Sequence, residues 1–355
     1  MHFTPLTLTF AILGISLLVV VHEAGHYLAA RAFGMKVLRF SIGLGPPLWK
    51  YQPKDSPTVF QVCAIPLLAY VQIAGMNPTE EIDKDDPTLY PNKGVFARIV
   101  TIFAGPAANY IAASVMLFVI AQVGGLPDEI VTNRVAATGG KGTPAQLAKL
   151  ATGDTVVEVN GHAVTDGEEL IEANRDRARQ ATTYVILRDG ERFEITLTPE
   201  LRKTGTGQVR ALIGVVLEGE RVYQTHPIGE AARYAVLGPY NLTLLNLQGI
   251  ARLVRRPDPN QIQSVVGMTK VLSTSFQEAP QQYVWILIQI SIALGLFNLL
   301  PFPALDGGRL TFLGYELITR RRANERVEAA IHTVGLLFLL GVLALVMVRD
   351  VINLT

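Results

Sequence analysis

Two histidines and a glutamate lie close together near the start of the chain. His22, Glu23 and His26 occupy the first, second and fifth positions of the segment HEAGH. On a helix, residues i and i+4 share one face about 5–6 Å apart, so both imidazoles can bind one metal ion. The glutamate beside the first histidine can then take a proton from a water that the ion polarises. The segment therefore predicts a zinc (Zn2+) centre with His22 and His26 as ligands and Glu23 as general base.

A catalytic zinc ion needs a third protein ligand and an open fourth position. Asp306 is the only acidic residue between Glu278 and Glu316, and a carboxylate at the end of an apolar span costs about 2.5–3.5 kcal/mol unless it has a partner. An aspartate that caps a helix before Gly307 would explain the residue equally well. We favour the ligand, because the topology described below puts Asp306 and the HEAGH segment on the same side of the membrane. We interpret the remaining histidines as structural or surface residues: His2, His162, His226 and His332.

The distribution of charge indicates what surrounds this site. The chain has 355 residues, a net charge of +1, 49% hydrophobic residues and a mean hydropathy of +0.31. Charged residues make up only 17% of it, below the roughly 25% of an average soluble protein. They leave four gaps, each longer than the roughly 18 residues that cross the hydrocarbon core as a helix. These gaps predict four membrane-spanning helices, at about 4–29, 97–123, 281–305 and 329–349.

Composition also excludes some kinds of site and partner. The near-neutral charge balance gives no reason to expect a nucleic-acid partner. Cys63 is the only cysteine, so an internal disulfide and an all-cysteine metal site are both excluded. The first apolar stretch lacks the charged n-region and the cleavage site of a secretion signal, so we interpret it as a retained span.

Lysine and arginine residues in the short loops set the orientation of the spans. Five follow the first span and five lie between the last two, so both loops belong inside, and the polar stretch 127–225 and both termini belong outside. Two more segments lack charge, 56–79 and 234–251. If one crossed the membrane, Asp306 would lie on the opposite side from His22; if both crossed, the polar stretch would be inside. We favour four spans, because prolines break the first segment into a strand-forming loop and the second suits a helix at the membrane interface.

Two motifs on separate spans together resemble a known family. The segments HEAGH at 22–26 and NLLPFPALDGG at 298–308 are similar to those of the site-2 protease family of intramembrane metalloproteases. The family pattern NxxPxPxLDGG is matched at every fixed position, and the bacterial regulator-of-sigma-E branch is a good match. The resemblance implies a zinc metalloendopeptidase that cuts the transmembrane segments of single-pass proteins after a site-1 protease has trimmed them. Anti-sigma factors and signal-peptide remnants are the substrates it implies.

The resemblance also assigns residues to substrate binding. The segment 36–75, with Gly43 and Gly45, resembles the family's membrane-associated β-hairpin, whose edge strand would pair with the substrate backbone; a buried structural hairpin is the alternative. Asn109, in AGPAAN at 104–109, would bond either a substrate or a neighbouring helix. Asn298 is implied to contact substrate, and Pro301 and Pro303 interrupt the helix and free carbonyls, which fits a hydrated cleft. A kink held by an asparagine bond is the alternative at that point.

The polar stretch 127–225 resembles a PDZ domain. Residues 153–161, GDTVVEVNG, are similar to the strand-and-turn signature of that fold, and 142–145 fit the segment before its short helix. Alternating residues at 184–187 and 193–197, on either side of Asp189-Gly190, predict a β-hairpin. Only one PDZ domain fits in this stretch, whereas the sigma-E proteases have two. Such a domain either binds a peptide at its groove or acts as a steric gate over the cleft.

Together these inferences predict a polytopic α-helical membrane protein with about four transmembrane helices, a membrane-associated β-hairpin and an inserted extracytoplasmic α/β PDZ domain. The expected domains are 1–126, with the first two helices; 127–225, the PDZ domain; 226–278, an interfacial helical connector broken at Pro257-Asp-Pro259; and 279–355, with the last two helices. The resemblance implies a bacterial inner (cytoplasmic) membrane, contact with the lipid bilayer and an active site towards the cytoplasm. The rival functions are a PDZ-bearing membrane scaffold with a structural zinc, which needs four filled ligand positions, and a metal transporter, which needs several acids or histidines along a path.

Overall fold

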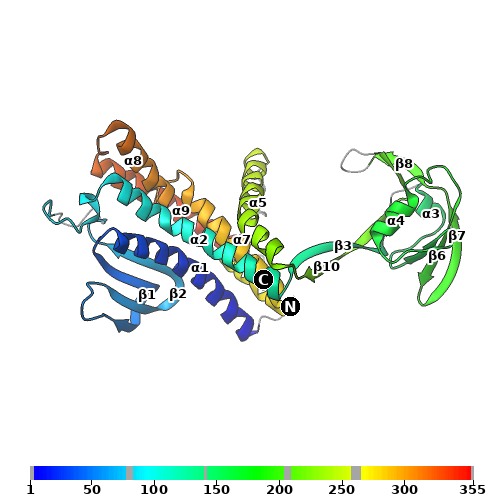
Figure 1. Ribbon diagram of the computed structural model, residues 1–355, viewed down its shortest axis with the longest axis horizontal. Helices are drawn as coiled ribbons and strands as arrows, with labels where there is room; N and C mark the ends of the chain where they lie inside the picture. The colour runs from blue at the N-terminus through cyan, green and yellow to red at the C-terminus, as the bar shows by residue number, and fades with distance from the viewer. Residues whose placement is uncertain (1–3, 77–82, 140–141, 204–208, 257–264, 353–355) are drawn as a thin grey trace. The chain divides into compact units, whose positions relative to one another are not determined.

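The computed structural model describes residues 4–76, 83–139, 142–203, 209–256 and 265–352. The chain divides into two compact units (Figure 1). One, the helical unit, combines Met1–Leu126 with Thr225–Thr355, and the other, the inserted unit, is Pro127–Gln224. The chain thus leaves the helical unit after its first two long helices and returns to it about 100 residues later, close to the bounds that the sequence predicts for the inserted module.

Four helices of the helical unit are long and apolar enough to cross a membrane, among the residues that the structure describes. Each overlaps one of the four predicted spans. They are α1 (Pro5–Ala32), α2 (Val95–Val123), α7 (Pro280–Leu299) and α9 (Glu325–Ile352). The helix α2 continues through Pro106. The other helices of this unit are α5 (Ile228–Arg255), α6 (Val265–Glu278) and α8 (Asp306–Thr319), with a 3₁₀ turn at Tyr90–Asn92.

The third span ends earlier than the charge pattern predicts. The helix α7 stops at Leu299, and Leu300 is extended, with φ −63° and ψ 142°. Proline disfavours the helical conformation in the residue before it and has no N–H to continue the ladder, so Pro301 ends α7. Asp306 therefore does not close the third span; it begins the separate helix α8 after a loop of six residues, 300–305.

A two-stranded antiparallel sheet follows α1. Its strands are β1 (Val37–Tyr51) and β2 (Val59–Ile73), and their register runs from Val37 opposite Ile73 to Tyr51 opposite Phe60. Much of the charge-free segment 56–79 is thus a β-strand rather than a helix, as the sequence predicts, although 77–79 lie outside the described residues. Ser16 of α1 donates a hydrogen bond to the carbonyl of Pro66, which fastens β2 alongside α1 (Figure 1).

The predicted interfacial connector is in part a packed helix. The helix α5 runs without interruption through Pro239. Its Ala231 lies in one core cluster with α2 and α7, and Leu242 packs against that cluster. The Thr243 and Tyr110 hydroxyls are 2.9 Å apart. The part of α5 from Ala231 to Thr243 therefore packs on two of the apolar helices. The break predicted at 257–259 lies outside the described residues.

The inserted unit contains a mixed arrangement of short strands and helices around one core. Its main sheet has the strand order β10-β3-β4-β6-β7, with β5 paired to β4. The predicted hairpin is confirmed, because β6 and β7 pair from Thr182 opposite Leu197 to Arg188 opposite Glu191. Its turn residues Asp189 and Gly190 both have positive φ, as a tight hairpin turn requires. The elements are β3 (Leu126–Thr138), α3 (Pro144–Leu147), β4 (Thr155–Val159), β5 (His162–Ala163), α4 (Gly167–Asn174), β6 (Thr182–Arg188), β7 (Glu191–Leu197), β8 (Glu200–Lys203), β9 (Val209–Leu212) and β10 (Val215–Gln224).

Candidate metal centre

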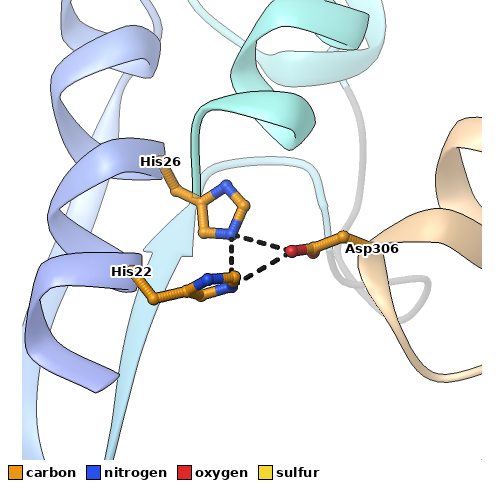
Figure 2. A group of neighbouring side chains, drawn as sticks. All are labelled: His22, His26 and Asp306. Carbon is orange, nitrogen blue, oxygen red and sulfur yellow. Dashed lines mark hydrogen bonds and ion pairs between the residues drawn. The ribbon is translucent and has the colours of Figure 1, made fainter. Parts of the chain in front are cut away.

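Three side chains predicted to hold a metal meet at one point (Figure 2). Nε2 of His22 lies 3.1 Å from Oδ2 of Asp306, and Nε2 of His26 lies 3.3 Å from the same oxygen. The two Nε2 atoms are 3.2 Å apart. The side chains are 8%, 10% and 17% exposed, respectively. Residues 280 positions apart in the sequence therefore form one small, largely buried cluster.

The spacing of these three atoms fits zinc. Bonds of about 2.0–2.2 Å to a tetrahedral ion place neighbouring ligand atoms about 3.3–3.5 Å apart, close to the 3.1, 3.3 and 3.2 Å found here. Oδ2 of Asp306 is buried and, apart from the two imidazoles, has no polar partner among the described residues. Two imidazole nitrogens and a carboxylate are a common donor set for this metal. The residues present therefore fit three corners of a zinc site.

No fourth ligand completes the tetrahedron among the residues that the structure describes. The cluster of His22, His26 and Asp306 is also the only group there of three or more histidine, cysteine, aspartate or glutamate residues with its ligand atoms close enough to hold an ion. A structural zinc site fills all four positions, whereas a catalytic site leaves one for water or substrate. The described part of the chain therefore matches the catalytic pattern.

The outer nitrogens of both imidazoles face α2. Nδ1 of His26 lies 2.8 Å from the carbonyl oxygen of Thr101. A carbonyl only accepts, so this Nδ1 carries the proton and Nε2 keeps its lone pair for a metal. Nδ1 of His22 lies 3.3 Å from the amide nitrogen Nδ2 of Asn109. Because a metal at Nε2 requires a proton on Nδ1, the Asn109 amide must turn over when the metal is bound, so that its oxygen accepts from the ring.

Of the two roles that the sequence leaves open for Asn109, a substrate contact and a bond to a neighbouring helix, this contact matches the second. The residue is 0% exposed, so a substrate cannot touch it in this conformation. The sequence motif alone could not reveal this, because it does not tell which face of α2 is enclosed. The alternative reading, a bond to a neighbouring helix, is the one that fits.

Two glycines allow α1 and α2 to approach closely at the metal centre. A Cβ on Gly25 would lie 2.8 Å from the Cβ of Ala108. A Cβ on Gly105 would overlap Nε2 of His26 and would lie 2.5 Å from its Cε1. Small residues let helix backbones come together in a membrane. Here they bring the backbone of α2 against the ring of His26, which is what places Thr101 and Asn109 behind the two imidazoles.

Gly307 and Gly308, which follow Asp306, also lie where the backbone of another segment passes too close for a side chain. A Cβ on Gly307 would lie 2.5 Å from the carbonyl oxygen of Leu299, and one on Gly308 would lie 2.5 Å from that of Phe302. The chain between α7 and α8 thus passes directly over the first turn of α8. The two glycines make that close passage possible, and the passage directs Asp306 toward α1.

A buried ion pair fixes the far end of α8. Arg98 of α2 donates two hydrogen bonds to the carboxylate of Glu316, one of them 3.0 Å long. Arg322 lies 3.4 Å from the same carboxylate. Burial raises the pKa of Glu316, but the hydrogen bonds and charges of Arg98 and Arg322 together lower it by more, so that the net pKa is below its ordinary value. The ionised pair joins the helix that carries Asp306 to the helix behind the histidines.

The proposed base is held by the neighbouring sheet. Oε2 of Glu23 accepts a hydrogen bond of 2.9 Å from the backbone N–H of Val71 in β2. Glu23 adjoins His22 in α1, so its position relative to the metal ligands follows from helix geometry together with this one anchor. The second carboxylate oxygen, Oε1, has no hydrogen bond within the described part of the chain, so it can accept from a water.

The remaining predicted substrate-binding residues have structural contacts of their own. The Asn298 amide donates to the carbonyl of Leu294, one turn earlier in α7, at 3.0 Å. Gly43 and Gly45 have φ of +90° and +92°, the left-handed region where glycine is favoured, within an irregular stretch of β1. Pro301 is exposed and Pro303 is partly buried in the 300–305 loop. These contacts account for the residue types without a substrate and leave the substrate contacts as predictions.

Comparison with known proteins places this centre in context. The model of peptidase family M50 matches residues 10–342. A Campylobacter jejuni protein described as a "putative zinc metalloprotease" is 31% identical over 352 residues, which cover 96% of this chain and 92% of that protein. A Mesorhizobium japonicum protein with the same description is 32% identical, covering 95% and 96%. Metalloprotease MmpA of Caulobacter vibrioides is 28% identical, covering 92% and 90%. A solved PDZ domain of an SdrC-like protein from Listeria innocua is 16% identical, with a TM-score of 0.21, and covers 26% of this chain and 99% of its own.

Proposed function

The chain belongs to peptidase family M50, and from that premise we propose that it is an intramembrane zinc metalloprotease that hydrolyses peptide bonds within the transmembrane segments of single-pass proteins. The observation that carries the proposal is the meeting of His22, His26 and Asp306 at tetrahedral spacing, with Glu23 beside them. The cluster lies on one helix that is apolar enough to span a membrane and at the end of the loop that follows another. That arrangement supports both the proposed chemistry and the proposed location of the reaction.

Each residue of the centre has a distinct task. His22, His26 and Asp306 would hold the ion, and the contacts of the two imidazoles with α2 keep the Nε2 atoms directed at the place it would occupy. The ion, when bound, acts as a Lewis acid that activates water and polarises the scissile carbonyl. Glu23 receives the proton of the attacking water on Oε1 and passes it to the departing amine as general acid. Val71 keeps the Glu23 side chain in place through Oε2 during both transfers.

The substrate must lose its helical structure before it reaches the centre. A helix holds each carbonyl in a bond to the N–H four residues later, where it is shielded from attack. The sheet of β1 and β2 lies beside α1 and contacts Glu23 through Val71. We infer that a substrate segment extends along β2 and adds a strand to that sheet, as the family resemblance implies. Asn298, Pro301 and Pro303 then border the cleft that receives it.

We infer that the protein resides in a bacterial inner membrane with the metal centre towards the cytoplasm. Four helices that are apolar enough to span the membrane support the membrane location. Lys and Arg residues concentrate in the segment after α1 and around α8, the loops expected to be cytoplasmic. The inserted unit then lies outside, where it acts as a PDZ domain that either binds a peptide or gates access for substrates trimmed beforehand by another protease.

The test compares the purified wild type with Glu23→Gln and Glu168→Gln, measuring bound zinc and cleavage of a single-pass membrane substrate in liposomes. Glu23→Gln should bind zinc as well as the wild type, because its side chain is no ligand, and should lose cleavage by about 10²–10⁴-fold. Glu168 is exposed in α4 and its variant should behave as the wild type. Undiminished cleavage by Glu23→Gln would refute the base, and a wild type that binds no zinc would refute the metal centre. A zinc-bound wild type that cleaves nothing would favour a scaffold.

A further inference from the structure

One face of α9 contacts the loop that leads to Asp306. His332, Gly335 and Phe338 recur at every third residue, which puts them on the same side of the helix. Nδ1 of His332 accepts a hydrogen bond of 2.9 Å from the backbone N–H of Ala304. The rings of Phe338 and Phe302 have their centroids 6.0 Å apart. A Cβ on Gly335 would lie 2.9 Å from the carbonyl oxygen of Pro303, so only a glycine lets the loop pack this closely against α9.

The loop needs such support because its conformation is unfavourable. Ala304 has φ +75°, in the left-handed region where a Cβ clashes with the following carbonyl. Pro301 and Pro303 on its N-terminal side have no N–H to donate. A cavity of about 570 Å³ is lined by both Ala304 and His332, so packing supports the loop incompletely on that side. A strained residue persists only when its surroundings determine its position, and the bond from Ala304 to His332 does this directly.

We propose that His332 is a positioning residue for the metal ligand Asp306, an inference that rests on the proposed function. Ala304 lies two residues before Asp306, and its N–H can only donate, so Nδ1 of His332 keeps its lone pair and the ring proton is on Nε2. Through this hydrogen bond α9 holds the backbone of Ala304 in place, and the position of Ala304 sets the direction of the Asp306 side chain two residues later. The sequence motifs contain no sign of this link, since His332 lies in a different helix from all three metal ligands.

Two amide substitutions separate positioning from simple packing. In His332→Asn the side-chain oxygen can occupy the place of Nδ1, whereas in His332→Gln it reaches about one atom further, to the place of Nε2. Both variants are polar and of similar size, so they differ mainly in where the acceptor lies. Leu337→Ala serves as the matched control on α9, because that side chain is 64% exposed. Zinc affinity is measured by chelator competition on the full-length purified protein, and the absorption spectrum of the cobalt-substituted form reports the ligand geometry.

His332→Gln should bind zinc about 10–100-fold more weakly than the wild type, as expected for a group that orients a metal ligand from outside, and its cobalt spectrum should change. His332→Asn should retain most of the affinity and the wild-type spectrum, and Leu337→Ala should match the wild type in both. If His332→Gln kept wild-type affinity and spectrum, or if His332→Asn lost as much affinity as His332→Gln, the inference would be overturned. A wild type that binds no zinc would instead refute the proposed function, so the two failures are distinguishable.

Discussion

Replacing Gly105 by alanine should strongly weaken zinc binding, because the new methyl group displaces His26. The added methyl group would overlap Nε2 of the His26 imidazole and would lie 2.5 Å from Cε1, whereas ordinary van der Waals contact begins at 3.4 Å. The ring, or the whole of α2, must therefore move by about 0.9 Å or more. Zinc–ligand distances are held to about ±0.2 Å, so a movement of this size takes Nε2 out of bonding range. We expect zinc affinity to fall by at least about 100-fold, the upper end of the effects of residues around a metal.

This loss has a measurable consequence for stability. At a free zinc concentration of about 100 times the wild-type Kd, binding stabilises the wild type by about 2.7 kcal/mol. A variant with about 100-fold weaker binding gains only about 0.4 kcal/mol at the same concentration. Thermal unfolding of Gly105→Ala with and without zinc, followed alongside chelator competition and substrate cleavage, measures the difference. Measuring the zinc-free protein as well separates lost metal binding from a general loss of fold.

The matched control is Gly94→Ala, at the start of the same helix. Its added methyl group would have no atom within 4 Å, and its φ of −56° suits alanine. This variant should bind zinc and cleave substrate as the wild type does. If Gly105→Ala retained wild-type zinc affinity and cleavage, the close approach of α2 to His26 would not be what positions the imidazole.

Two further predictions concern ion pairs that hold the fold. Burial raises the pKa of Asp154, but the hydrogen bonds from Arg188 and from the backbone N–H of Ala151, together with the charge of Arg188, lower it by more in total, so that the net pKa is below the ordinary 3.8. The carboxylate therefore stabilises the inserted unit above about pH 4, and this contribution is lost as the pH falls through the lowered pKa. Hydrogen exchange of the β4 and β6 amides should show that protection falls with acid in the wild type and is lower, but less dependent on pH there, in Asp154→Asn; equal pH profiles would contradict the assignment. Glu316→Gln leaves the buried guanidinium of Arg98 without its charged partner, so it should lower the free energy of unfolding by up to about 3–5 kcal/mol. The double variant Arg98→Met/Glu316→Leu should recover much of this lost free energy, as thermal unfolding would measure. A double variant no more stable than Glu316→Gln would show that the loss comes from packing instead.

Local features of the chain were predictable because each depends on near neighbours in the sequence. His22 and His26 share a helix face through their spacing alone, and the four apolar helices follow from gaps in the charge. The hairpin around Asp189-Gly190 follows from turn chemistry and the alternation on either side. The end of α7 was misplaced by several residues, because the charge gap runs on to Asp306 whereas the prolines stop the helix first.

Contacts between residues on different helices could not be predicted from the sequence. The sequence leaves Asn109 open between a substrate and a neighbouring helix, and the structure encloses it behind His22. His332 is interpreted as structural from the sequence, but its partner, the backbone N–H of Ala304 two residues before Asp306, is found only in the structure. In both cases the residue type was visible in the sequence, but its neighbour was not, because which faces of two helices meet depends on how they pack.

The sequence by itself determined the donor set: two imidazoles one helical turn apart, a glutamate between them, and one carboxylate in an apolar region far along the chain. It also determined that four segments of the chain are long and apolar enough to cross a membrane. Only the tertiary structure decided that these donors lie 3.1–3.3 Å apart and that their outer nitrogens face α2. The physical reason is that helix geometry fixes distances within a turn, whereas the distance between helices depends on what the glycines at their crossings allow and on how a strained loop is held.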